Sequence, residues 1–106
     1  FIKGRKKDMI IVGGENVYAA EVEAVLMTHA GVRETAVKGV PATGVRESLG
    51  ELIRAYIVTD NTELNVQELR RHCSKRLASY QVPHEVVFLE RLPRNPAGKV
   101  VKAELD

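Results

Sequence analysis

A lysine near the C-terminal end of the chain stands in a setting that suits the binding of an anion. Lys99 lies in the run Pro93-Arg94-Asn95-Pro96-Ala97-Gly98-Lys99-Val100. The two prolines fix φ and remove backbone donors, and Gly98 admits backbone angles that other residues resist. These residues predict a shaped, exposed loop that presents one ammonium group. A plain surface turn with a solvated lysine has a similar composition, so the run by itself leaves both interpretations open.

A glycine pair near the start of the chain is the second candidate for chemistry. Gly13 and Gly14 follow the β-rich run Met9-Ile10-Ile11-Val12 and precede a helical pattern. Backbone N–H groups at the start of a helix bind phosphate, which suggests a phosphate loop. The spacing argues against that loop, because Gly98-Lys99 is followed by Val100 and the sequence contains no Gly-x-Gly-x-x-Gly. The residues alone therefore favour a turn at this pair.

The other titratable residues have simple structural interpretations. The three histidines, like the single cysteine, show no metal-ligand spacing, so no zinc site is predicted. Cys73 falls on an apolar helical stripe and is predicted to lie in the core, where a thiolate is disfavoured. Glu21 and Glu23 are interpreted as surface carboxylates near the positive end of a helix dipole. The basic run Arg5-Lys6-Lys7-Asp8 is, taken alone, typical of a solvated turn.

The elements that must position these residues alternate along the chain. A ribbon is predicted at the start, with residues 2–6 pairing with 9–12 around a turn at Lys7-Asp8. A helix over 19–30 is expected to end at Gly31, and Asn65 with Glu68 resembles a capping box that starts a helix over 66–79. Strands are predicted over 32–40, 51–59 and 86–89, a loop over 41–50 and a short helix within 100–105. This order predicts an α+β domain: a small three-stranded sheet with two packing helices, plus an N-terminal two-stranded ribbon.

Composition limits the function classes. The chain has 106 residues, 44% of them hydrophobic, which fits one domain with a modest core. Its net charge is +2 and its aromatic content 5%, so neither nucleic acid nor a membrane surface is indicated as a partner. It lacks an apolar run of the roughly 18 residues that a membrane span needs. A single cysteine and the absence of a signal pattern favour the cytoplasm, and the start without methionine suggests a piece cut from a longer chain.

Two separated motifs give the chain a family resemblance. The first is Gly4-Arg5-Lys6-Lys7-Asp8-Met9-Ile10-Ile11-Val12-Gly13-Gly14-Glu15-Asn16-Val17, followed by Ala20-Glu21-Val22-Glu23, and the second is the Lys99 run. Together they resemble the C-terminal domain of the adenylate-forming enzymes, in the branch of the AMP-forming acyl- and aryl-CoA synthetases. The resemblance extends over essentially the whole chain, including Tyr80-Gln81-Val82-Pro83.

The resemblance implies roles for individual residues. Residues 1–8 would be the hinge segment from an N-terminal domain that is not part of this chain, and 9–106 would be a C-terminal lid domain. Lys7 matches the family's hinge position, and Arg5 matches the arginine that approaches the nucleotide. Lys99 matches the lysine that acts in adenylate formation. Gly13 and Gly14 match the face that closes for thioester formation, where Gly14 lines the passage for the pantetheine arm of CoA.

The implied reaction activates a carboxylic acid with ATP and then transfers the acyl group to CoA, with the domain rotating between the two half-reactions. ATP and its magnesium ion would be bound mainly by the N-terminal domain, so this domain alone is expected to be inactive. Two alternatives stay open. The acceptor could be the phosphopantetheine of a carrier protein, or the chain could be a binding module that does not catalyse.

Overall fold

The computed structural model describes residues 9–105. It begins with a β-hairpin in which β1 (Met9–Val12) pairs antiparallel with β2 (Glu15–Tyr18). The two-stranded ribbon predicted at the start of the domain is therefore confirmed, but the partner of β1 follows it in the chain. β2 is not predicted from the sequence, and the strand predicted over 2–6 lies outside the described residues.

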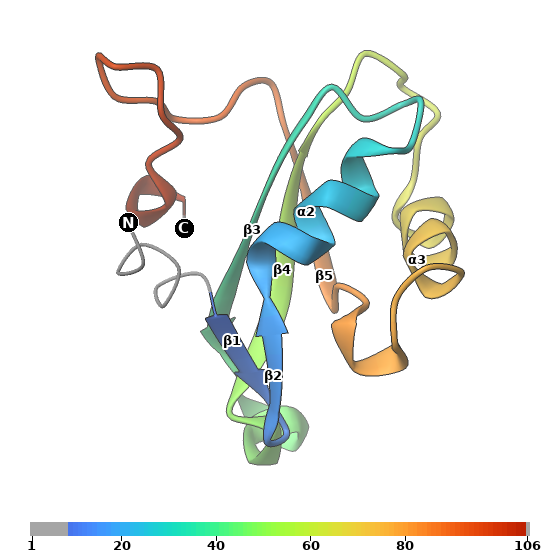
Figure 1. Ribbon diagram of the computed structural model, residues 1–106, viewed down its shortest axis with the longest axis vertical. Helices are drawn as coiled ribbons and strands as arrows, with labels where there is room; N and C mark the ends of the chain where they lie inside the picture. Colours follow the sequence, from blue (N-terminus) through green and yellow to red (C-terminus); the bar gives the residue numbers. More distant parts are fainter. Residues whose placement is uncertain (1–8, 106) are drawn as a thin grey trace.

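A three-stranded sheet forms the centre of the domain, in the order β3-β4-β5. β3 (Glu34–Pro41) and β4 (Glu51–Val58) are antiparallel and are joined through the 3-10 helix η1 (Gly44–Leu49). β4 and β5 (Glu85–Leu89) are parallel, and the helix α3 (Val66–Ser74) lies between them in the chain. A parallel pair needs such a crossover, because the chain must return to the end of the sheet from which it started. The predicted α+β class is confirmed (Figure 1).

The first helix, α2 (Ala19–Met27), ends earlier than its sequence pattern predicts. Thr28 is its C-cap, and the Thr28 hydroxyl donates to the Val25 carbonyl at 2.6 Å. Gly31 has no positive φ, so the predicted glycine cap is wrong. The helix ends early for a local reason. The Thr28 hydroxyl bonds to a carbonyl of the last turn before the chain reaches Gly31.

The second helix, α3 (Val66–Ser74), begins as predicted and ends early. Asn65 Oδ1 accepts from the Glu68 N–H at 2.8 Å, which confirms Asn65 as the N-cap. The second half of the predicted capping box would be a bond from the Glu68 side chain back to the Asn65 backbone. Among the described contacts, the Glu68 carboxylate instead bonds to His29, in the turn after α2. The helix stops before residue 79 because the N–H groups of Arg76 and Leu77 both bond to the Cys73 carbonyl in a tight turn. The short 3-10 helix η2 (Ser79–Gln81) follows.

Both faces of the sheet are covered. On one face, β4 contributes Ala55 and Ile57 to a core that includes residues of α2 and α3. On the other face, Tyr56 and Val58 pack with Leu92 and Leu105 of the C-terminal segment, which includes the 3-10 helix η3 (Lys102–Glu104). Figure 1 shows the helices and this segment on opposite sides of the sheet. Among the described residues, no helix has the length and apolar character to cross a membrane.

Candidate functional site

Lys99 lies on an ordered hairpin loop. The Asn95 N–H donates to the Lys99 carbonyl at 2.9 Å, and the Gly98 N–H donates to the Asn95 carbonyl at 2.8 Å. Gly98 has a φ of 89°, which a residue with a Cβ rarely adopts. At the base of the loop, the Val101 N–H donates to the Pro93 carbonyl at 2.9 Å. The shaped loop predicted from the Pro and Gly residues is present.

The side chain of Asn95 closes this loop from within. Its Oδ1 accepts from the N–H of Ala97 at 2.9 Å and from the N–H of Lys99 at 3.0 Å. Asn95 was not among the residues predicted to have a role. A signal was available, because an asparagine that bonds to the backbone two residues on is common in turns. Asn95 thus holds the backbone of Lys99 directly.

The Lys99 side chain is exposed. Within residues 9–105, no hydrogen bond or ion pair to its ammonium group is recorded. Solvated lysines are common, but the backbone of this one is held by hydrogen bonds within the loop, chiefly to Asn95. The arrangement can offer a positive charge to an anion that approaches from outside the domain.

The glycine pair forms the turn of the β1–β2 hairpin, so the turn favoured by the residues alone is confirmed, although the element that follows it is the strand β2 and not a helix. Gly13 and Gly14 have φ angles of 57° and 88°. Two positive φ angles in succession suit a two-residue hairpin, because such turns match the twist of the strands. The Gly13 N–H donates to the Leu49 carbonyl at 2.8 Å, which leaves that donor unavailable to a phosphate.

The two glycines differ in their surroundings. A Cβ on Gly13 would lie 3.3 Å from Leu49 Cδ2, whereas a Cβ on Gly14 would meet no atom of the structure within 4 Å. Gly14 therefore faces open space beside the hairpin. A passage for a narrow ligand would need open space of this kind beside Gly14. An ordinary turn glycine at the surface also has open space beside it.

The loop that carries Lys99 and the turn that carries Gly14 lie in different parts of the domain. Figure 1 shows the loop of the C-terminal segment in the upper part of the view and the turn of the β1–β2 hairpin at the bottom, along the longest axis, which measures 35 Å. The loop and the turn therefore present two separate parts of the surface. Arg5 and Lys7, the other predicted site residues, lie outside the described residues.

An open cavity of about 500 Å³ lies between β1, β3 and the C-terminal turn. Its lining includes Ile10, Gly39, Glu51 and Lys102. Neither Lys99 nor Gly14 is among the lining residues. The two candidate residues are thus presented on the outside of the domain and do not share this cavity.

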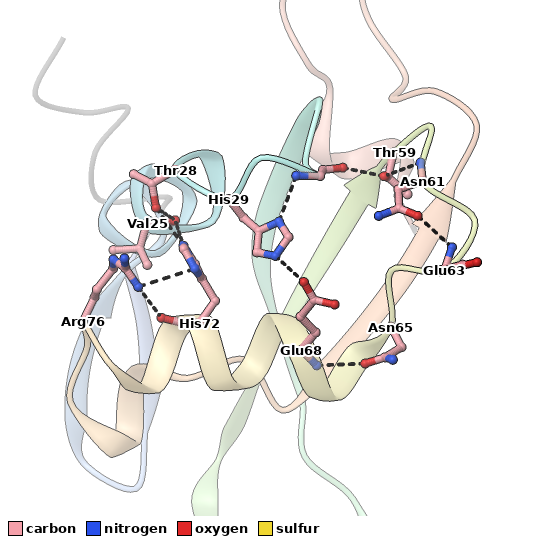
Figure 2. Close-up of polar contacts among 11 residues, drawn as sticks. Val25, Thr28, His29, Thr59, Asn61, Glu63, Asn65, Glu68, His72 and Arg76 are labelled. Atoms are coloured by element: carbon pink, nitrogen blue, oxygen red, sulfur yellow. Dashed lines mark hydrogen bonds and ion pairs between the residues drawn. The ribbon is translucent and has the colours of Figure 1, made fainter.

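His29, in the turn after α2, and His72, in α3, take part in a group of polar contacts (Figure 2). His29 Nδ1 accepts from the Gly31 N–H at 2.9 Å, so the proton of the neutral ring lies on Nε2, which contacts Glu68 Oε2 at 2.8 Å. His72 Nε2 lies 2.7 Å from Thr28 Oγ1 and 3.1 Å from the Val25 carbonyl.

These contacts are structural in character. The rings of His29 and His72 meet edge to face with centroids 5.0 Å apart. Burial lowers the pKa of His72, and the nearby charges of Arg76, His29 and Lys75 lower it further. In the part of the chain that the structure describes, no three His, Cys, Asp or Glu side chains are placed to hold a metal ion.

Cys73 lies in the core, as its position on the helical stripe predicts. Its side chain is 0% exposed, and burial raises the pKa of its thiol to about 11. A thiolate nucleophile is therefore excluded at this position near neutral pH.

The fold and the site define a small α+β domain that presents a lysine loop on one part of its surface and a glycine hairpin on another, without enclosing either in a cavity. Such a domain can complete a binding or active site whose other residues belong to another domain. The chain belongs to the family of the AMP-binding enzyme C-terminal domain, whose model matches residues 21–99.

Relatives at the level of sequence are ligases. The chain is 48% identical over 105 residues to the long-chain-fatty-acid–CoA ligase FadD13 of Mycobacterium tuberculosis, covering 99% of this chain and 20% of that protein. It is 44% identical over 105 residues to the 2-succinylbenzoate–CoA ligase of Bacillus licheniformis, covering 99% of this chain and 21% of that protein. The chain thus spans about a fifth of the length of these relatives.

Solved structures give the same result. A Mycobacterium tuberculosis fatty acyl CoA synthetase matches with a TM-score of 0.86 and 47% identity, over 93% of this chain and 19% of that one. The amide bond synthetase McbA from Marinactinospora thermotolerans matches with a TM-score of 0.85 and 37% identity, also over 93% of this chain and 19% of that one. The fold is thus similar in proteins named for different acyl acceptors.

Proposed function

We propose that this chain is the mobile C-terminal domain of an AMP-forming acid–CoA ligase. The observation that carries the proposal is the exposed Lys99 on its ordered loop, in a chain that belongs to this family. The sequence relatives named as CoA ligases support the reaction class.

In the proposed first half-reaction, a carboxylate oxygen attacks the α-phosphorus of ATP. A bond forms between them, the bond to the β-phosphate oxygen breaks, and pyrophosphate leaves. Negative charge converges from the carboxylate and the phosphate, so one positioned ammonium stabilises both the approach and the transition state. We assign this role to Lys99. The magnesium ion expected with ATP would be held elsewhere, since residues 9–105 contain no cluster suited to a metal ion.

In the proposed second half-reaction, the CoA sulfur attacks the acyl carbon, the thiol proton is lost and AMP leaves. Gly14 lines the pantetheine passage in this step, together with the neighbouring Gly13, because the space beside Gly14 is open. The separate placement of the Lys99 loop and the Gly14 turn supports a rotation of the domain between the steps, with Lys7 as hinge and Arg5 near the nucleotide (Figure 1).

The half-reactions can be tested separately in the full-length enzyme. Lys99→Ala is expected to slow adenylate formation, measured as acid-dependent exchange of pyrophosphate into ATP, by about 10²- to 10³-fold. Transfer from a supplied acyl-adenylate to CoA should be largely retained. Equal loss in both steps would show that Lys99 is structural, and robust exchange by the 106-residue chain alone would contradict the half-site proposal.

The acceptor is tested by competition. Acyl-adenylate is offered CoA, a carrier protein with its phosphopantetheine arm, or a simple amine, and the products are separated by mass. Thioester on CoA is expected. Preferred loading of the carrier protein would favour the first alternative, and preferred amide formation would favour the reaction named for the McbA relative. A full-length protein that neither activates an acid nor transfers it would favour a binding module.

A further inference from the structure

One side chain ties the Lys99 loop to the sheet. Arg94 Nη1 donates to the Gly98 carbonyl at 2.7 Å, and Arg94 Nη2 donates to Glu34 Oε1 at 2.6 Å. One nitrogen of the guanidinium therefore binds the residue before Lys99, and the other binds the first residue of β3. Such a double contact suits arginine, because its donors form a rigid fork.

The two ends of this link differ in rigidity. Glu34 stands in the antiparallel register opposite Val58, which is 6% exposed, so the sheet fixes its backbone. The Gly98 carbonyl belongs to a loop whose other bonds are internal, through Asn95. Leu92 and Val100 at the base of the loop pack on the sheet, but the bonds within the loop do not tie its tip to the sheet. The Arg94 contact with Glu34 and with the Gly98 carbonyl supplies that tie.

We propose that Glu34 is a positioning residue for adenylate formation, acting through Arg94 on the loop that carries Lys99. This inference rests on the proposed function of Lys99. Glu34 does not touch the reacting atoms. Its carboxylate holds the guanidinium, the guanidinium holds the Gly98 carbonyl, and the next residue in the chain is the lysine.

The expected effect is moderate. The side chains of Arg94 and Glu34 are 43% and 36% exposed, and a pair with that exposure shifts an equilibrium by about two- to fivefold. Misplacement of a catalytic group by a small distance adds to the loss, up to about 100-fold in rate. Glu34→Ala is therefore expected to reduce the rate of adenylate formation by about three- to tenfold.

A double-mutant cycle in the full-length enzyme tests whether Glu34 acts through Arg94. Glu34→Ala, Arg94→Ala and the double variant are compared by pyrophosphate exchange. In the Arg94→Ala background, Glu34→Ala should cause no further loss, because contacts in series are not additive. Arg94→Lys should resemble Arg94→Ala, since an ammonium lacks the fork that reaches both acceptors. Additive losses would overturn the proposal.

Asp60→Ala is the matched control. Arg33 pairs with Asp60 at 3.1 Å at the same end of β3, but this pair makes no recorded contact with the loop. Its loss should leave adenylate formation within the error of the assay. A similar loss in Asp60→Ala would mean that surface charge, and not the loop contact, causes the effect.

Hydrogen exchange gives a measure that does not depend on catalysis. In Glu34→Ala, amides of the segment 93–101 should exchange faster, while the helices α2 and α3 should be unchanged. If Lys99→Ala shows that the lysine is not catalytic, faster exchange would still establish that Glu34 orders the loop. Unchanged exchange in the loop would overturn the positioning role, whatever the activity of Lys99.

Discussion

Glu23 and Lys102 form an ion pair of 2.9 Å between Oε2 and Nζ, which joins α2 to η3. The same carboxylate oxygen accepts from the Val37 N–H at 2.8 Å, and Lys102 Nζ donates to the Val37 carbonyl at 2.8 Å. A helix, a strand and the C-terminal segment therefore meet at one side chain. The interpretation of Glu23 as a surface carboxylate is wrong, because its side chain is only 25% exposed and has two partners.

Glu23→Ala should destabilise the domain. Val37 is 0% exposed, so its N–H would lose its acceptor in a buried position. The expected cost is about 1–3 kcal/mol in the free energy of unfolding, measured by urea denaturation. Glu21→Ala is the control on the same helix, since Glu21 contacts Gln81 at the exposed surface, and its effect should stay within about 0.5 kcal/mol. Equal effects would contradict the assignment of Glu23.

Gly14→Leu should impair thioester formation more than adenylate formation in the full-length enzyme. A branched side chain would occupy the open space beside the hairpin, where the pantetheine arm is proposed to pass. The φ of 88° adds a strain of about 1–2 kcal/mol, which a melting curve would detect.

Gly44→Leu separates strain from obstruction. Gly44 has a φ of 65° and open space around its Cβ position, so the substitution brings a similar strain at another site. Both variants should melt lower, and only Gly14→Leu should raise the CoA requirement. If both variants lose the two half-reactions alike, Gly14 is only a turn residue.

The stability of the domain should fall as the pH falls from about 7 to 5, in part through His72. Burial lowers the pKa of His72 in the folded state, and its charged neighbours lower it further, so the unfolded chain binds a proton that the folded domain resists. The contribution of His72 is therefore lost below its ordinary pKa of 6.5. His72→Gln should reduce the slope of unfolding free energy against pH.

His84 should contribute to the same pH dependence independently. Burial lowers the pKa of His84, and the positive charges of Arg46 and Arg70 lower it further. The Nδ1 atom of His84 accepts a hydrogen bond from the Ile53 N–H at 3.0 Å. Protonation of Nδ1 would break that bond. The variant with both His72→Gln and His84→Gln should have a flatter profile than either single variant. A slope unchanged in all three would show that other groups control the acid limb.

Cys73 should not react with thiol reagents in the folded domain at pH 8. Its side chain is 0% exposed, so a reagent cannot reach the sulfur. Burial raises the pKa of the thiol to about 11, so little reactive thiolate is present at pH 8. Labelling should become rapid in denaturant, at a rate that follows unfolding. Fast labelling of the native protein would contradict the buried position.

Features that depend on near neighbours in the chain could be predicted from residue types and spacing. The Asn95 to Gly98 turn, the Asn65 cap and the apolar stripe that buries Cys73 each arise from residues within one or two turns of chain. Their bonds form among atoms that the backbone already holds close together, so residue type and spacing are sufficient to predict them. The two family motifs likewise identified the class of protein.

Contacts between distant segments depend on how the elements pack, and local patterns did not predict them. The pairing of Glu34 with Arg94 and of Glu23 with Lys102 depends on how the C-terminal segment packs on the sheet, which no local pattern encodes. Thr28, the C-cap of α2, likewise has a distant partner, since its Oγ1 lies 2.7 Å from Nε2 of His72 in α3. Charged residues are mostly exposed and lose exposure only where they find a partner, so their roles depend on the partners that the packed elements bring to them.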